Sequence, residues 1–265
     1  WLYQKKFLRG LPLYFILFYP SLLLYTSLSL RDPLIMFLMT ISVIFFIDKK
    51  YFRFFLVISP LYILKFQNFF LMIIFFVIFI ILKKDTLFYK IRYPLIGLII
   101  IIMGLNLEQI IFLFNRYRNA MFFENFVYGS NSTAIEQFQR IEGLYSFFIL
   151  SLKNIPYYIL KPLPWEAESF FQSIQSFENI LILLFLIVFT KKAYAQSLFL
   201  TNKWLLFFLI TMGVYGIVVF NFGTGARYKY PFMVIYVIGL SYDLYKNCGY
   251  RFDLNSKKKK TTNNI

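Results

Sequence analysis

The sequence predicts an all-α fold: a polytopic transmembrane helix bundle of about eight spans, several of them short, with one large extracytoplasmic loop. Hydrophobic residues make up 60% of the chain and the mean hydropathy is +0.65, whereas a soluble domain is nearer to half apolar. The apolar residues gather in about eight runs, and charged residues close each run. Basic residues crowd alternate connections between the runs, which is the pattern expected if each run crosses a bilayer.

The distribution of charge orients this bundle. If every run crosses the bilayer, one side collects 19 of the 28 basic residues and four of the 12 acids, a net charge of +15. The other side carries nine bases and eight acids, a net charge of +1. The bases of the first side are Lys5, Lys6, Arg9, Lys49, Lys50, Arg53, Lys83, Lys84, Lys90, Arg92, Lys191, Lys192, Lys203, Lys246, Arg251 and Lys257 to Lys260. Positively charged loops stay in the cytoplasm during insertion, so this side is expected to be cytoplasmic.

The expected spans differ in length. They are Leu11–Leu30, Pro33–Ile47, Tyr51–Leu64, Phe69–Leu82, Tyr93–Leu107, Asn179–Thr190, Trp204–Phe220 and Phe232–Tyr245. A bilayer core needs about 20 helical residues, and the shorter runs require thinned lipid, snorkelling side chains or broken helices. Pro20 lies inside the first span and predicts a kink there.

The segment 51–82 allows two interpretations. It forms either two short spans or one long tilted helix in which Lys65 snorkels toward the membrane surface. One long helix would invert every later segment and would place the basic loop 83–92 outside the cytoplasm. Because the charge rule disfavours that arrangement, we predict two spans.

Four regions follow from this pattern. Residues 1–107 form an N-terminal membrane bundle of about five spans, 108–178 an extracytoplasmic amphipathic loop, 179–247 a C-terminal bundle of about three spans, and 248–265 a basic cytoplasmic tail. Within the loop, apolar and polar residues mix in a pattern that predicts short helices on the membrane surface. The chain begins with Trp1 instead of Met, so we expect a further segment upstream.

Composition limits the chemistry. The chain has no histidine, which removes the commonest general base and metal ligand. Cys248 is the only cysteine, so an intrachain disulfide cannot form. A net charge of +16 in a soluble protein would suggest nucleic acid. Here the bases flank apolar runs, so we expect anionic lipids of the inner leaflet as the partner, and no nucleic acid.

A first charged motif stands between two spans. Arg31 and Asp32 precede Pro33 at the extracytoplasmic end of the second span. They could form a mutual ion pair in which Asp32 also caps the helix that begins at Pro33. Alternatively, Asp32 is a carboxylate oriented by Arg31 that binds metal or acts as a base.

A second motif precedes the last span, and it is the strongest functional signal. Two glycines, Gly223 and Gly225, stand beside Asn221 and Thr224, and their pattern predicts a break that exposes backbone N–H groups. Arg227 and Lys229 follow on the side that the charge rule disfavours for bases. Exposed amides with an arginine fork and a lysine suit a phosphate group.

Further candidates lie in the large loop. Arg116 and Arg118 leave the fifth span, and Glu124 follows them. The prolines of Lys161-Pro162-Leu163-Pro164-Trp165 predict a rigid turn, and Trp165 suits the membrane interface. Glu166 and Glu168 come next, either as acids of a site or as a solvated edge.

Two parts of the chain resemble bacterial polytopic proteins of surface-polysaccharide biosynthesis, the group of GT-C glycosyltransferases and O-antigen polymerases. One part runs from Leu11-Pro12 through Pro20 to Asp32. The other is the pairing of residues 161–165 with residues 221–231. The resemblance implies a multi-helix bundle that acts on polyprenyl-phosphate-linked sugars at its outer face. It also implies a key carboxylate in the first outer loop, which we expect upstream of this chain, so Asp32 is not equated with it.

The expected protein is therefore an integral protein of the bacterial inner membrane that transfers or polymerises sugars from a polyprenyl-phosphate-linked donor. A lipid-linked glycan transporter or flippase and a non-catalytic membrane subunit are the alternatives. A transporter predicts ionisable residues inside the spans, and Lys65 is the one ambiguous case. The cofactor stays open, with a divalent cation as one option, and no metal ligands are assigned. Other glycan-assembly proteins are expected partners.

The expected site combines both motifs with the loop. Asp32, Glu124 and Glu166 are the candidates for activating an acceptor hydroxyl. The residues expected to bind the pyrophosphate and the sugar are Arg31, Arg116, Arg118, Trp165, Asn221, Gly223, Gly225, Arg227, Tyr228 and Lys229.

Overall fold

The computed structural model describes residues 10–28, 31–82, 93–94, 96–97, 101, 104–128 and 139–250. In these ranges every regular element is a helix, which confirms the all-α class. The helices are α1 (Leu11–Leu17), α2 (Pro20–Leu28), α3 (Arg31–Ile47), α4 (Tyr51–Ile58), α5 (Leu61–Leu64), α6 (Phe66–Leu82), α8 (Leu107–Tyr128), α9 (Leu144–Leu160), the 3-10 helix η2 (Pro164–Glu166), α10 (Phe170–Tyr194), α11 (Leu198–Val218) and α12 (Phe222–Cys248).

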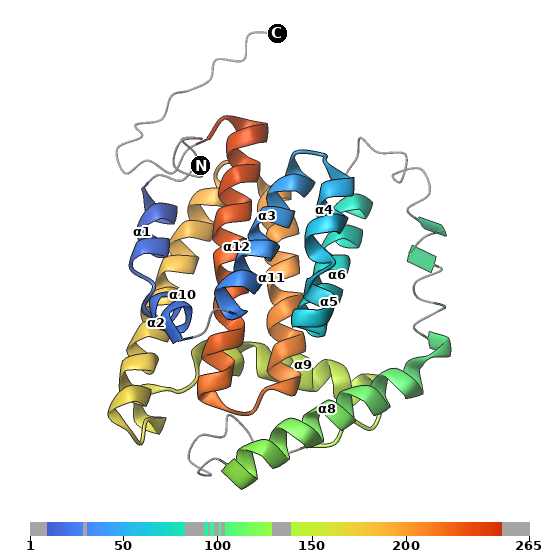
Figure 1. Cartoon of the computed structure of the whole chain (residues 1–265), viewed down its shortest axis with the longest axis vertical. Coiled ribbons are helices and arrows are strands. Elements are labelled where there is room, and N and C mark those ends of the chain that lie inside the picture. Colours follow the sequence, from blue (N-terminus) through green and yellow to red (C-terminus); the bar gives the residue numbers. More distant parts are fainter. Residues whose placement is uncertain are drawn as a thin grey trace.

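Most of the helices run side by side, and two lie across one end of the bundle. Helices α3, α4, α6, α10, α11 and α12 run roughly up and down the molecule in Figure 1, whereas α8 and α9 cross its lower end. Two helices, α10 with 25 residues and α11 with 21, are long and apolar enough to cross a membrane. The other helices of the described ranges are shorter or less apolar, so within these ranges length and composition support two of the eight expected spans.

The segment 51–82 folds back on itself. Helices α4 and α5 descend to Lys65, and α6 returns beside them, so that the ring of Tyr51 lies 5.8 Å from that of Phe76. Phe54 also faces Phe76 across the same contact, with ring centroids 5.4 Å apart. One long helix is therefore not formed, and Lys65 stands at the turn between two short helices.

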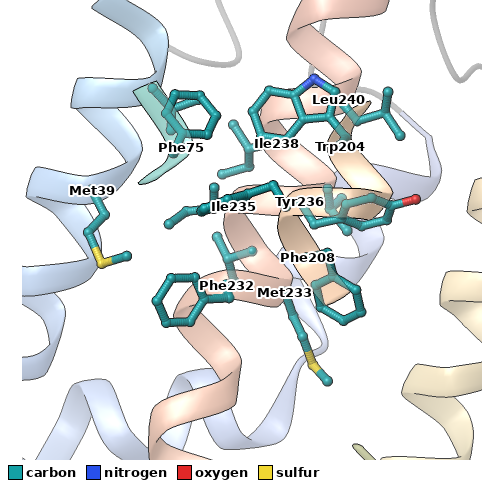
Figure 2. Close-up of a cluster of buried hydrophobic side chains, with 14 of the residues drawn as sticks. Met39, Phe75, Trp204, Phe208, Phe232, Met233, Ile235, Tyr236, Ile238 and Leu240 are labelled. Carbon is teal, nitrogen blue, oxygen red and sulfur yellow. The ribbon is translucent and has the colours of Figure 1, made fainter. Parts of the chain in front are cut away.

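Helix α12 lies in the middle of the bundle and is buried over most of its length. Its apolar side chains meet Trp204 and Phe208 of α11 on one side and Met39 of α3 and Phe75 of α6 on the other (Figure 2). The indole of Trp204 lies directly over Gly239, because a Cβ atom added there would stand 2.1 Å from the ring. A glycine at this position lets a large aromatic side chain approach the helix backbone.

Two ion pairs join the helix ends at the upper end of the bundle in Figure 1. Lys246 of α12 pairs with Asp48 after α3 at 2.6 Å, and Lys203 of α11 pairs with Asp243 of α12 at 2.9 Å. The indole N–H of Trp204 donates to the same Asp243 carboxylate at 3.0 Å. Basic residues that are far apart in the sequence thus lie at the same end of the bundle.

Helix α9 crosses the opposite end and contacts α11 closely. The side-chain amide of Asn154 donates to the carbonyl of Gly216 at 3.0 Å. A Cβ atom added at Gly216 would meet the carbonyl of Asn154 at 3.0 Å, so a larger residue would push α9 outward by a few tenths of an ångström. Asn115 of α8 exchanges two hydrogen bonds with the backbone of Ile141, and these bonds hold α8 against the segment that leads into α9.

Several expected boundaries are wrong, each for a local reason. The span Leu11–Leu30 is broken, because Pro20 begins a separate helix instead of kinking a continuous one. Helix α10 begins nine residues before Asn179, where Ser169 caps its first turn. Helix α12 begins ten residues before Phe232, where Asn221 caps it. The expected span Tyr93–Leu107 and the tail 251–265 lie largely outside the described residues.

Candidate functional site

An ion pair between distant parts of the chain defines the candidate site. Asp32 stands in the first turn of α3, and Arg227 stands in the second turn of α12. The guanidinium Nε of Arg227 donates to Oδ2 of Asp32. The Asp32 side chain is 8% exposed, whereas that of Arg227 is 39% exposed. The arginine can therefore reach an incoming ligand, while the carboxylate lies beneath it.

Lys65 is the second cation of this cluster. It stands at the turn between α5 and α6, and its ammonium lies 3.2 Å from the ring centroid of Tyr228. Burial lowers the pKa of Lys65 to about 7. The charge of Asp32 opposes that shift, and the charges of Arg227 and Arg31 add to it. These four charged groups therefore act on one another at the end of the bundle that α9 crosses.

Arg31 is the third cation. Its guanidinium donates to the backbone carbonyl of Leu64, next to Lys65, instead of pairing with Asp32. The mutual Arg31–Asp32 pair is therefore replaced by contacts that join α3 to α5 and α12. Three basic side chains against one carboxylate leave an excess of positive charge, which suits an anion.

A layer of aromatic and polar side chains supports the cluster from inside the bundle. The ring of Tyr228 lies 5.4 Å from that of Tyr215, whose hydroxyl donates to the side chain of Asn68. Tyr158 of α9 stacks on Tyr215 at 6.5 Å and donates to the carbonyl of Gly225. These contacts hold the first turns of α12, where Arg227 stands, against α6, α9 and α11.

The break in the helix that was expected at residues 221–231 is not formed, because α12 begins at Phe222. Oδ1 of Asn221 accepts hydrogen bonds from the N–H groups of Gly223 and Thr224, and the Asn221 carbonyl accepts from Gly225. Asparagine is a strong N-cap because its side chain satisfies these otherwise orphaned donors. The glycines lie in the first helical turn, so their amides are used by the cap and are not presented to a phosphate.

Lys229 lies outside the cluster. It is buried, and its ammonium donates to the side chain of Asn179 on α10 and to the carbonyl of Ile159 on α9. On a helix, residues two apart point in different directions, which separates Lys229 from Arg227. Its contacts join three helices, and we assign it a positioning role instead of the expected binding role.

The two loop arginines also separate. Arg118 is fully buried and donates to the carbonyls of Ile217 and Gln139, while its guanidinium lies 4.9 Å from the ring centroid of Phe220. It fastens α8 to the end of α11. Arg116 is exposed on α8, and none of the contacts described for the site involves it.

The remaining loop candidates lie apart from Asp32. Glu166 pairs with Lys161 at 3.0 Å and accepts from the Leu163 N–H, which stabilises the η2 turn. Trp165 is exposed beside it. Glu124 lies on α8, and its side chain is outside the described residues. Of the three expected acids, Asp32 alone is shown in contact with the basic cluster.

Metal ligation has little support from the described part of the chain. Within it, no three His, Cys, Asp or Glu side chains gather closely enough to hold an ion. Asp32 is a single carboxylate, and one of its oxygens already accepts from Arg227. A divalent cation at this position would need further oxygen ligands from a substrate.

No protein-family model, no curated protein and no solved structure matches this chain.

Sequence reasoning paired Asp32 with the wrong arginine, and it placed Lys65 between two spans without assigning it to the site. The signal that could have placed Lys65 is its isolation: it is the only base between Arg53 and Lys83, and it stands where two apolar helices meet. The contact of Arg227 with Asp32, 195 residues away, has no counterpart in local sequence.

Proposed function

We propose that this chain is an integral protein of a bacterial inner membrane that binds polyprenyl-phosphate-linked sugars and transfers or polymerises them. The reaction takes place at the bundle end that carries Asp32, Lys65 and Arg227, and this end faces the extracytoplasmic side. The observation that carries the proposal is the cluster of three bases around one carboxylate, at the end opposite to Lys203 and Lys246.

Two properties support the membrane location. In the apolar 18-residue stretch of each helix, only 33% of the residues are buried in α10 and 44% in α11. The core helix of a soluble protein is mostly buried. The outer surface also carries many exposed large apolar side chains, among them Phe37, Phe52, Ile63, Leu181 and Leu184. Soluble monomers rarely expose contiguous apolar patches larger than a few hundred Å², and lipid is the environment that fits such a surface.

The shorter helices fit the same proposal. With 17 residues each, α3 and α6 are about 25 Å long at 1.5 Å per residue. A hydrocarbon core is about 30 Å thick, and locally thinned lipid accommodates the difference. Together with α4–α5, α10, α11 and α12 they supply the short and long spans of the proposed bundle.

The cluster suits the phosphate of a lipid-linked donor. Arg227 is partly exposed and carries planar N–H groups that match phosphate oxygens. Lys65 and Arg31 add positive charge beside it. A phosphate that binds Arg227 competes with Asp32 for the guanidinium and so releases the carboxylate.

That exchange gives Asp32 its role in transfer. The released carboxylate accepts the proton of the acceptor hydroxyl, and the resulting oxygen forms a bond to the anomeric carbon of the donor sugar. The bond between that carbon and the phosphate oxygen breaks, and the electron pair leaves with the lipid phosphate. Arg227 and Lys65 stabilise the charge of this leaving group.

Transport of a lipid-linked glycan is the second candidate. The observation that favours it is the polar content of the bundle interior, where Lys229, Asn179, Asn68 and Asp243 are buried within helices. Such residues mark pathways in transporters. A transporter moves a labelled lipid-linked sugar across a vesicle membrane and forms no glycosidic bond, which distinguishes the two activities.

Binding of farnesyl pyrophosphate, a short isoprenyl pyrophosphate, tests the site in detergent-solubilised protein by calorimetry. We expect Arg227→Gln to weaken binding by about 10- to 100-fold, because a hydrogen bond to a charged group contributes roughly 1.5–3 kcal/mol. Arg53→Gln removes one charge at the other end of the bundle and is the matched control, with unchanged affinity.

Asp32→Asn separates binding from chemistry. We expect it to bind farnesyl pyrophosphate at least as tightly as the wild type, because Arg227 is released, and to abolish glycan transfer in cells. Wild-type affinity in Arg227→Gln, or normal glycan length and amount with Asp32→Asn, would refute the site.

A further inference from the structure

Helix α9 exposes large apolar side chains on its outward face, unlike a helix on the surface of a soluble protein. Its outward side chains are apolar: Tyr145 is 80% exposed, Phe148 62% and Leu152 69%. Its inward face buries Leu150 and Tyr158, and it also carries the polar side chain of Asn154, which is 2% exposed and bonded to α11. A soluble amphipathic helix turns its apolar side inward, so the outward face of α9 is suited to an apolar medium.

The position of α9 identifies that medium. It crosses α11 at Gly213 and Gly216, close to the end of α11 at Val218, and it runs across the bundle helices in Figure 1. If α11 crosses a bilayer, its 21 residues extend for about 31 Å at 1.5 Å per residue, close to the full hydrocarbon thickness. A helix that crosses the end of such a span lies in the plane of the membrane, at the level of the head groups.

Aromatic and basic residues near α9 fit this level. Trp165 is exposed in the short connection from α9 to α10, and Phe170 and Phe171 are exposed at the start of α10. Trp in particular concentrates at membrane interfaces. Lys153 is exposed on α9 beside Leu152, where its ammonium can reach lipid phosphate. The apolar surface of α9 thus continues toward the exposed face of α10 through residues typical of the interface.

We propose that α9 is an in-plane membrane helix whose outward face, Tyr145, Phe148 and Leu152, is inserted among lipids at the end of the bundle that carries Asp32 and Arg227. The occupant of this face is the lipid bilayer itself, not a second protein chain. The inference rests on the membrane location in the proposed function but not on its chemistry. The hydroxyl of Tyr158 on α9 donates a hydrogen bond to the carbonyl of Gly225. The in-plane helix is therefore attached directly to the first turn of α12.

Spin labels in proteoliposomes test this placement. Single cysteines replace Phe148 or Leu152 in a Cys248→Ser background, and each label is measured for collision with oxygen, which concentrates in lipid, and with a water-soluble nickel chelate. Leu184→Cys on the exposed face of α10 is the lipid reference, and Glu168→Cys is the water reference. We expect both α9 labels to favour oxygen, as Leu184→Cys does, but at a shallower depth.

Each other outcome has a distinct meaning. If the α9 labels collide with nickel as Glu168→Cys does while Leu184→Cys favours oxygen, the in-plane placement is wrong and the membrane location stands. If the α9 labels are protected from both reagents, a protein covers this face and the placement is also wrong. If Leu184→Cys itself favours nickel, the membrane location fails together with the placement.

Discussion

At the scale of single residues, Lys65 sets the electrostatics of the candidate site. It stands at a helix turn, its ammonium faces the ring of Tyr228, and burial lowers its pKa to about 7. A neighbouring carboxylate, Asp32, raises this pKa, and the guanidinium groups of Arg227 and Arg31 lower it. The charge of the site therefore changes close to neutral pH, where an ordinary lysine keeps its proton.

We expect the affinity for an isoprenyl pyrophosphate to depend on this protonation. Below pH 7 Lys65 is charged and attracts the anion, and above pH 7 it becomes neutral, so binding weakens as pH rises. Calorimetry with farnesyl pyrophosphate between pH 6 and pH 8.5 measures the effect.

Lys65→Arg is the matched variant because arginine keeps its charge over this range. The ligand gains negative charge with pH, and both proteins experience that gain equally. The affinity of the wild type relative to Lys65→Arg is therefore expected to fall on going from pH 6 to pH 8.5. A constant ratio would show that Lys65 does not titrate here.

At the scale of elements, the length and the close packing of helix α12 depend on its capping residues and on small residues along it. Asn221 begins it ten residues earlier than its apolar run indicates, and Gly249, with a φ of 64°, ends it. Pro231 inside the helix has no N–H to donate to the carbonyl of Arg227, four residues earlier. At Gly239 the helix backbone is in direct contact with Trp204. These residues let one long helix join the basic cluster to the ion pairs at the other end.

Gly239→Ala is expected to destabilise the protein. The added methyl group would lie 2.1 Å from Trp204, and such overpacking costs about 1–3 kcal/mol. Alanine regains up to about 1 kcal/mol through its helix propensity, so we expect a net loss of roughly 1–2 kcal/mol in the free energy of unfolding. Thermal unfolding in detergent, followed by tryptophan fluorescence, measures it.

The control is Gly213→Ala in α11, where the new Cβ meets Ile155 at an ordinary 3.5 Å. It gains the same propensity without a clash, so its midpoint is expected to stay unchanged or to rise. Equal midpoints for the two variants would contradict the contact between Trp204 and Gly239.

At the scale of the whole molecule, the fold separates two kinds of charge. One end carries ion pairs that are internally balanced, Lys246 with Asp48 and Lys203 with Asp243. Burial alone would raise the pKa of Asp48, but the hydrogen bonds and charge from Lys246 and the hydrogen bond from Tyr242 bring it below its usual value. The other end carries the unbalanced cluster around Asp32. In the proposed orientation, the balanced end faces the cytoplasm.

Labelling of cysteines from one side of the membrane tests this orientation. Cys248 is exposed at the end of α12, and we expect an impermeant maleimide to label it in inverted membrane vesicles but not in intact spheroplasts. Glu168→Cys in a Cys248→Ser background is expected to show the opposite pattern. Labelling of both positions from the same side would contradict the predicted topology.

The sequence by itself determined the helical class, the turn at Lys65 and the choice of Asp32 and Arg227 as functional candidates. Apolar periodicity and charge spacing are local properties, so they predict the structure of each segment without reference to its neighbours in space. Local pattern also misjudged the start of α12, because the cap at Asn221 extends a helix through residues that otherwise resemble a loop.

Only the tertiary structure decided which side chains meet. It joined Asp32 to Arg227, it placed Lys65 near enough to feel both charges, and it turned Lys229 and Arg118 into the interior. The physical reason is that helix direction and rotation are set by packing against distant neighbours, and a single sequence does not name those neighbours.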